Sequence, residues 1–343
     1  MLLEGLHIPL TTPFHPDGRL NLHKLASNIV RYSKTPAAGL IVLGPNAEPT
    51  LLSDDETREV LRTAALSAAP EKVLIAGISR DSVQATLALA DFAAGLNYDA
   101  MLIGSPSIII DSTELLTYFR TIADRSPLPL ILSSIDPRSI PIEAIVELAA
   151  HSNVIGLISS ESHSDVPTEV LARTTAIKRE VTVTLTFTAV TSRMKNSAAS
   201  HASATLISTS SLTGAATAIA EPPLPALRTR TRTISFQILA AAPTSALEYL
   251  RAGSTGIAPN FAACAPQACY EVFAAWKDDD QPLADEKQIR LIGAARLAEA
   301  TPGSLKFACD LNGYFGGAPR LPHLPPTGEQ RANLETQMKR LRN

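Results

Sequence analysis

An acidic and histidine-containing segment at residues 161–165 follows directly on an apolar run at residues 153–158. Glu161, His163 and Asp165 alternate in this segment. Carboxylates and imidazole suit a divalent metal ion, which would polarise a carbonyl group of a ligand. The alternative is an exposed loop in which Asp165 caps the following helix, because three side chains of alternating direction rarely converge on one ion. We favour the loop and expect neither a metal nor another cofactor.

Three cysteines, Cys264, Cys269 and Cys309, are the other candidates for reactive or metal-binding groups. They lack the C-x-x-C spacing of a zinc site and stand in alanine-rich sequence, which predicts small buried side chains. They are also too few for the disulfide framework of a secreted domain. We therefore expect a reducing, cytoplasmic setting.

The composition of the 343-residue chain excludes several classes of partner. Hydrophobic residues make up 45% and charged residues 18%, and the formal net charge is -3. This balance supplies apolar surface for a core and gives no reason to expect nucleic acid or an anionic membrane as partner. Because the sequence has no run of about 18 apolar residues and no basic segment leading into an apolar one at its start, we expect neither membrane spanning nor export.

Short apolar runs alternate with segments of helical periodicity over the first 160 residues. The expected strands begin near residues 5, 39, 72, 99, 128 and 153. Ser53 with Glu56 forms the signature of a helix capping box, and Asp111 with Glu114 marks a second helix start. Strands that are apolar throughout indicate a parallel sheet covered on both faces. The repeated units predict a (β/α)8 TIM barrel, with chemistry at the carboxyl ends of its strands.

A doubly wound open sheet is the structural alternative. Many open sheets that bind dinucleotides carry G-x-G-x-x-G after a strand, and this chain has no such motif at any expected strand. We therefore favour the closed barrel.

The pattern becomes ambiguous after the sixth strand. A helix is expected at about 167–178 and a β-branched strand at 181–187, but residues 188–232 are rich in Ala, Ser and Thr. This composition predicts a low-complexity insertion that packs poorly and is cut first by proteases.

Two segments, 191–204 and 244–257, compete for the last helix and strand of the barrel. We favour the later one, together with a strand at 236–241, because Leu247, Tyr249 and Leu250 supply core contacts. The expected domains are a barrel at 1–260, interrupted at about 188–232, and a C-terminal helical extension at 261–343. Helices in this extension are expected at about 265–276, 284–300 and 327–341.

Several stretches resemble one enzyme family. They are GLHIPLTTPFHPDGRLN from residue 5, GLIVLGPNAEPTLLSDDETREVL from residue 39, PLPLILSSIDPRS from residue 127, SALEYLRAGSTGIAPNFA from residue 245 and GAPRLPHLPP from residue 317. Over residues 3–160 and 233–341 the chain resembles the dihydrodipicolinate synthase and N-acetylneuraminate lyase family, the class I pyruvate-dependent aldolases. The resemblance implies a barrel with added C-terminal helices.

The resemblance assigns the family's reactive groups to positions that hold other residues here. Ile158 stands where the family has the lysine that forms a Schiff base with a 2-oxo acid. Ser133 corresponds to the proton-shuttling tyrosine at the end of strand five, and Ile108 or Ser107 to a further relay tyrosine. Isoleucine supplies neither a nucleophile nor a proton.

Other positions of the family's site match in part. Pro45 and Asn46 replace a Thr-Thr pair that helps to bind the oxo-acid carboxylate. The expected substrate-binding set is Thr12, Gly44, Pro45, Asn46, Glu48, Ser133 and Arg138. Lys178 and Lys195 follow strand six, but we expect them to be solvated surface lysines rather than a relocated imine lysine.

Three functional hypotheses remain open. The chain is a carbon–carbon lyase or aldolase with an altered catalytic set, for which Glu161, His163 and Asp165 would supply a metal-assisted variant. Alternatively, it is a barrel that binds a small 2-oxo acid or carboxylate without catalysis, or a partner subunit, and the resemblance implies a homo-oligomer, either a dimer or a tetramer. The third hypothesis is a chain damaged between residues 158 and 232.

Overall fold

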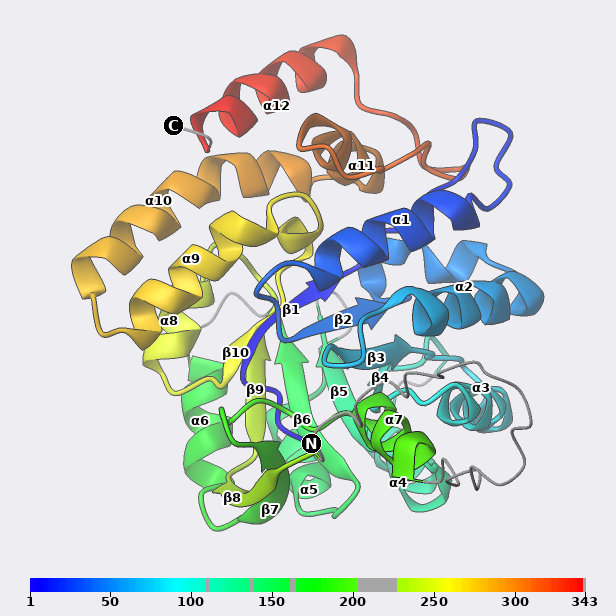
Figure 1. Ribbon diagram of the computed structural model, residues 1–343, viewed down its shortest axis with the longest axis vertical. Coiled ribbons are helices and arrows are strands. Elements are labelled where there is room, and N and C mark those ends of the chain that lie inside the picture. The colour runs from blue at the N-terminus through cyan, green and yellow to red at the C-terminus, as the bar shows by residue number, and fades with distance from the viewer. Residues whose placement is uncertain (109–110, 136–138, 161–164, 203–226, 342–343) are drawn as a thin grey trace, which may run out of the picture.

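The protein is built on a closed barrel of parallel strands (Figure 1). The computed structural model describes residues 1–108, 111–135, 139–160, 165–202 and 227–341. The strands of the barrel are Gly5–Pro9 (β1), Gly39–Val42 (β2), Val73–Gly77 (β3), Ala100–Gly104 (β4), Leu130–Ser134 (β5), Val154–Ser159 (β6), Gln237–Ala240 (β9) and Gly256–Ile257 (β10). Their order around the barrel is β1-β10-β9-β6-β5-β4-β3-β2, and each neighbouring pair is parallel. The predicted TIM barrel is therefore confirmed.

Helices follow the strands and cover the outside of the barrel. They are Leu22–Ser33 (α1), Asp54–Ser67 (α2), Val83–Gly95 (α3), Ser112–Arg125 (α4), Ile142–Ala149 (α5), Asp165–Arg173 (α6) and Ala246–Arg251 (α8). The predicted capping box is present: Ser53 Oγ accepts from the Glu56 amide, and the Glu56 carboxylate accepts from the Ser53 amide. Asp111 caps α4 by accepting from the amides of Thr113 and Glu114.

The barrel strands bury both of their faces. One set of side chains, which includes Ile41, Ile75, Ile131, Ile158 and Leu239, fills the barrel interior as a cluster of its own. The alternate residues of the same strands belong to a larger cluster that they share with the surrounding helices. This double burial explains why the strands are apolar throughout rather than alternating.

The last barrel strand, β10, comes from the later of the two competing segments, and β9 matches the strand expected at 236–241. β9 pairs with β6, and β10 closes the barrel against β1. Leu247, Tyr249 and Leu250 of α8 are buried, which confirms the reason for preferring that segment. The earlier segment instead contributes Ser192–Ala202 (α7), which lies outside the barrel.

A two-stranded antiparallel ribbon, Arg179–Thr184 (β7) and Thr229–Ile234 (β8), precedes β9 and is not part of the barrel wall. Figure 1 shows the ribbon and α7 near the N-terminus, on the side of the molecule away from the C-terminal helices. Val181 and Val183 of the ribbon pack against Leu2. The predicted strand at 181–187 thus exists but begins and ends earlier.

The segment that leads into α7 packs closely on the amino ends of the barrel strands. The Ser192 amide donates to Asp99 Oδ1 at 2.6 Å, and the guanidinium of Arg193 donates to the carbonyls of Ala68 and Lys72. Val190 and Thr191 are buried. The expectation of poor packing is therefore wrong for residues 189–193, because polar side chains here satisfy backbone groups that the composition does not reveal. Residues 203–226 lie outside the described residues.

Four helices form the C-terminal extension: Pro266–Lys277 (α9), Gln281–Ala298 (α10), Pro302–Leu311 (α11) and Gly328–Arg340 (α12). Figure 1 shows α10, α11 and α12 stacked along one side of the barrel. The sequence predicts all of them except α11. Within the described part of the chain, no helix is both long and apolar enough to cross a bilayer.

Candidate functional site at the carboxyl ends of the barrel strands

Ser133 and Ile158 lie side by side at the carboxyl ends of β5 and β6. They are direct neighbours in the register of the two strands. Ile158 is 2% exposed and belongs to the interior cluster, as does Ile131, which precedes Ser133 by two residues and shares its face of β5. The two positions that the resemblance assigns to the imine lysine and the relay tyrosine therefore both point into the barrel.

The loop after β2 brings an amide group to the same end of the barrel. A short 3-10 turn, Pro45–Ala47, follows Gly44. Within it Asn46 is buried, and its Nδ2 donates to the Pro9 carbonyl at 3.0 Å. Its Oδ1 accepts no hydrogen bond from the described residues. Because a buried acceptor without a donor costs free energy, Asn46 Oδ1 is a ready acceptor for a ligand N–H or O–H group.

Glu48 is the only acidic member of the expected substrate-binding set, and its carboxylate is engaged. The residue has a left-handed backbone with φ of 56° and is 3% exposed. One carboxylate oxygen pairs with Lys306 Nζ, and the other accepts from the Arg320 amide at 2.9 Å. Glu48 therefore holds the C-terminal segment at this loop.

Lys306 lies on α11 and is buried as deeply as its partner. Its Nζ donates to the Ala318 carbonyl at 2.9 Å and lies 4.3 Å from the centre of the Phe14 ring. Burial lowers the pKa of the Lys306 amine, and the carboxylate of Glu48 opposes that shift. With Nζ enclosed by these three groups, the amine is a structural cation rather than an exposed nucleophile.

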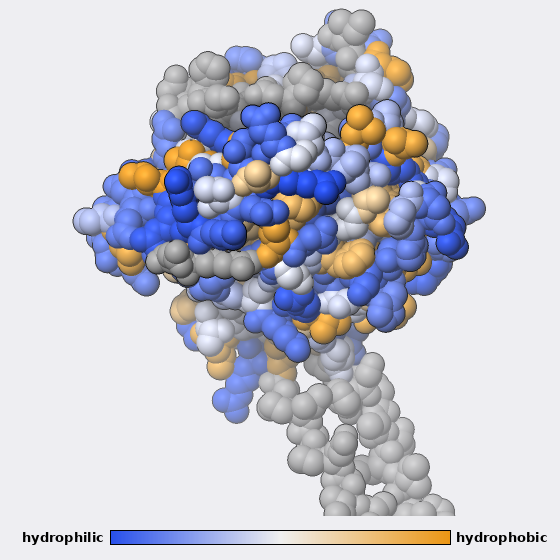
Figure 2. Space-filling model, turned by 90° about the horizontal axis from the view of Figure 1, so that it is seen from above, coloured by the Kyte–Doolittle hydropathy of each residue, from blue (hydrophilic) through white to orange (hydrophobic). Residues whose placement is uncertain are grey.

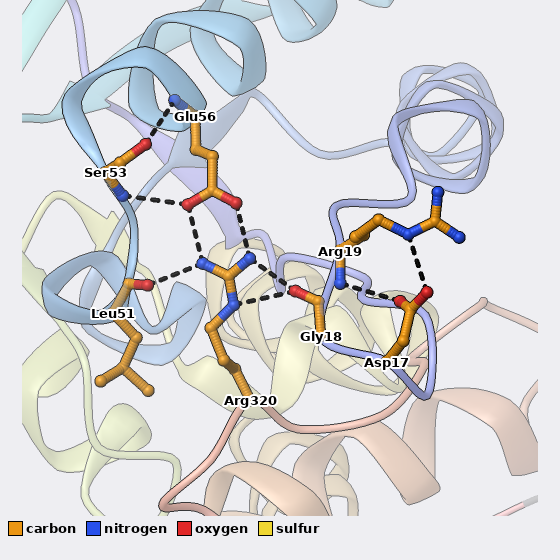
Figure 3. Close-up of polar contacts among 7 residues, drawn as sticks. All are labelled: Asp17, Gly18, Arg19, Leu51, Ser53, Glu56 and Arg320. Carbon is orange, nitrogen blue, oxygen red and sulfur yellow. Dashed lines mark hydrogen bonds and ion pairs between the residues drawn. The ribbon is translucent and has the colours of Figure 1, made fainter.

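A second ion pair, between Arg320 and Glu56, ties the C-terminal segment to α2 (Figure 3). Two parallel bonds of 2.6 and 2.8 Å join the guanidinium and the carboxylate. Arg320 also donates to the carbonyls of Gly18 and Leu51. Hydrogen bonds from Arg320 lower the pKa of the Glu56 carboxyl. This pair fixes the loops around the site but leaves no charge free to bind a ligand.

The other residues singled out in the sequence differ in where they lie and how exposed they are. Thr12 is buried just beyond β1, whereas Arg138 lies outside the described residues. Ser107 and Ile108 are exposed in the loop after β4. Lys178 and Lys195 are exposed, as predicted for surface lysines.

The proposed metal ligands cannot be assembled from the described residues. Glu161 and His163 lie outside them, and only the backbone of Asp165, the first residue of α6, is described. Across the described part of the chain, no group of three or more His, Cys, Asp and Glu side chains is suited to a metal ion. All three cysteines are buried free thiols, as expected.

Lys306 and Arg320 are the residues near the site that sequence reasoning missed. A lysine is normally assigned to the surface, and α11 itself was not predicted. Glu48, expected at the site, is the signal that would have pointed to them, because a buried carboxylate requires a cation or several donors.

Comparison of the chain with models of known protein families gives a match. The model of the dihydrodipicolinate synthetase family matches residues 2–218. The chain belongs to this family. Membership places it among aldolase- and lyase-type proteins.

Individual relatives agree with this assignment. The chain is 26% identical to a 4-hydroxy-tetrahydrodipicolinate synthase of Acidiphilium cryptum, over 98% of both chains. It is 31% identical to an L-threo-3-deoxy-hexylosonate aldolase of Hypocrea jecorina, over 44% of this chain and 52% of the aldolase.

Solved structures share the fold. A dihydrodipicolinate synthase of Bacillus anthracis matches with a TM-score of 0.78 at 18% identity, covering 99% of each chain. A prophage protein of the same family from E. coli K12, solved in complex with pyruvate, matches with a TM-score of 0.76 at 19% identity, over 100% of this chain and 99% of that one.

Proposed function

We propose that this family member binds a small 2-oxo acid or related carboxylate without forming a Schiff base. The observation that carries the proposal is Ile158, which faces the barrel interior at the end of β6, beside Ser133. An imine requires a primary amine. Among the described residues, the buried lysine near this end of the barrel is Lys306, and its amine is paired with Glu48.

Neutral polar groups offer a ligand hydrogen bonds at this end of the barrel. Asn46 Oδ1 accepts no hydrogen bond from any part of the chain that the structure describes, and the Ser133 hydroxyl is able both to donate and to accept. We propose that the hydroxyls of Ser133 and Thr12 donate to the oxo-acid end of the ligand, that Arg138 pairs with its carboxylate, and that Asn46 Oδ1 accepts from a hydroxyl group elsewhere on a larger ligand. The pyruvate complex of the E. coli relative supports this ligand class.

We also propose that the protein is cytoplasmic and assembles as a homo-oligomer. The use of cysteine as buried free thiols suits the cytoplasm, and family resemblance suggests a homo-oligomer, either a dimer or a tetramer. The same site is also compatible with a role for this chain as a non-catalytic partner subunit, in which ligand binding serves assembly or regulation rather than turnover.

Calorimetry with pyruvate tests the proposed function. We expect saturable binding that Asn46→Asp weakens at least several-fold, because the new carboxylate repels the anionic ligand. Asn196→Asp is the matched control, since it adds the same charge at an exposed position of α7 and should leave binding unchanged. No heat of binding with pyruvate or with longer 2-oxo acids, from a protein shown to be folded by circular dichroism, would reject the proposal.

A further inference from the structure

Two buried thiols face each other between the barrel and the C-terminal helices. Cys264 follows the short 3-10 helix Asn260–Ala263 (η4), which comes after β10, and Cys309 lies on α11. Their Sγ atoms are 3.4 Å apart, and both residues are fully buried. Neither thiol has a place in the proposed ligand site.

The contacts around the two thiols are reciprocal. Cys264 Sγ donates to the carbonyl of Leu305, on the helix that carries Cys309. Cys309 Sγ lies 3.4 Å from the carbonyl of Ala263, the residue before Cys264. Each sulfur therefore contacts the backbone of the segment that carries the other cysteine. A disulfide requires the sulfurs to approach by a further distance of roughly 1.3 Å, to a bond of about 2.05 Å.

We propose that Cys264 and Cys309 are a covalent modification site that forms a disulfide when the protein meets a hydroperoxide. This inference does not depend on the proposed ligand. One thiol, as thiolate, attacks hydrogen peroxide, which breaks the O–O bond, yields a sulfenic acid and releases a first water. The second sulfur then displaces the sulfenic oxygen as a second water. The two sulfurs lose two electrons in total, and both thiol protons leave in the waters.

Burial sets the rate of this reaction. Removal from water raises the pKa of the Cys264 thiol well above its ordinary value, with the neighbouring Cys309 thiol as a further cause. A thiol is far less nucleophilic than a thiolate, so oxidation requires local opening around α11. We expect the pair to react slowly with peroxide and to be protected once the disulfide has closed.

The disulfide would fix the helix that reaches the candidate site. Cys309 and Lys306 are three residues apart on α11 and thus lie on neighbouring parts of its surface. Lys306 pairs with Glu48 in the loop after β2. Joining α11 covalently to the segment after β10 would therefore hold the Lys306–Glu48 contact in place and slow the release of the C-terminal helices.

Intact-mass analysis of the full-length protein after exposure to hydrogen peroxide tests the inference. We expect the loss of two hydrogens, restored by dithiothreitol, and a peptide map in which Cys264 and Cys309 are linked. Cys269 is the internal control, because it is equally buried on α9 and should be alkylated in denaturant whether or not peroxide was added. The oxidised protein should melt a few degrees higher than the reduced one.

Two variants distinguish a disulfide between Cys264 and Cys309 from non-specific oxidation of the protein. Cys309→Ala should abolish the loss of two hydrogens, whereas Cys269→Ala should retain it. The wild-type peptide map decides the question even if a variant does not fold. A map that links Cys269 to either partner, a mass gain of oxygen atoms without a cross-link, or three alkylatable thiols after prolonged exposure would overturn the proposal.

Discussion

At the scale of single residues, Ile158 and Ser133 stand where the family resemblance places a lysine and a tyrosine. Ile158 and Ser133 occupy neighbouring, inward-facing positions, so a lysine and a tyrosine at these positions would also meet. The side chains present offer an apolar surface and one hydroxyl. Binding and catalysis are therefore separable here, and single substitutions can test them one at a time.

Ile158→Lys should restore weak trapping of pyruvate by borohydride. The new amine would stand in an apolar environment, where desolvation lowers its pKa toward the range in which it attacks a carbonyl. Adding Ser133→Tyr should improve turnover more than trapping, because a tyrosine there transfers protons after the imine forms. Intact mass and a coupled aldolase assay measure the two effects, with Ile158→Met as the control of similar bulk.

If the double variant folds but neither traps pyruvate nor is stabilised by any 2-oxo acid, the strand alignment that places Ile158 at the lysine position must be abandoned.

Glu299 makes stability depend on pH. Burial raises the pKa of its carboxyl from 4.5 to about 7, against a hydrogen bond from the Phe261 amide. The folded state thus holds the proton more tightly than the unfolded chain, so the stability gained from the neutral carboxyl is complete below about pH 4.5 and is lost as the pH rises through about 7.

Glu299→Gln should therefore have little effect on the free energy of unfolding near pH 4.5 and should stabilise the protein by roughly 3 kcal/mol above pH 8. Urea unfolding over this pH range measures the difference. Glu335→Gln, on an exposed site of α12, is the control and should show no such trend. A pH-independent effect of Glu299→Gln would show that the carboxyl does not titrate in this range.

At the scale of elements, α11 joins the C-terminal extension to the loops around the site. It carries Lys306, and the segment after it carries Arg320. Both cations lie 4.3 Å from the centre of the Phe14 ring, so two ion pairs and one aromatic ring hold a single junction. We propose on this basis that the extension at 261–343 folds onto the barrel at 1–260 as a cooperative unit.

A double-mutant cycle tests this junction. Lys306→Met leaves the Glu48 carboxylate buried without its cation and should cost about 3–5 kcal/mol, and Glu48→Gln should cost a similar amount. The double variant should cost clearly less than the sum, because neither charge is then left alone. Urea unfolding of the four proteins gives the coupling free energy. Additive losses would mean that the two side chains do not interact in the folded protein.

The sequence predicts some helices and strands correctly and others not, for physical reasons that differ between elements. The barrel strands were predictable because residues such as Leu40 and Ile41 are both apolar and both buried. The place of β7 was not predictable, because alternating β-branched residues form a strand equally well in a barrel or in a ribbon. Helix α11 was missed because its most deeply buried charged residue, Lys306, reads as a surface residue until its distant partner Glu48 is known.

At the scale of the whole molecule, a complete TIM barrel presents Ser133 and Ile158 at the carboxyl ends of its strands, where such barrels do their chemistry. Seen from the side on which α12 lies, the surface is mostly hydrophilic, with hydrophobic residues in small scattered groups (Figure 2). The position of the site was predictable, because strand ends follow from the periodicity. The engagement of Glu48 was not, since it depends on residues about 260 positions away in the sequence.

Borohydride reduction of the wild-type protein with pyruvate, followed by intact-mass measurement, tests the central claim most directly. We predict no increase in mass, because Ile158 supplies no amine at the end of β6 and the Lys306 amine is enclosed. The relative from Acidiphilium cryptum serves as the comparison protein under the same conditions. A stable adduct of one pyruvate per chain on the wild-type protein would contradict the account, and peptide mapping would identify the lysine that carries it.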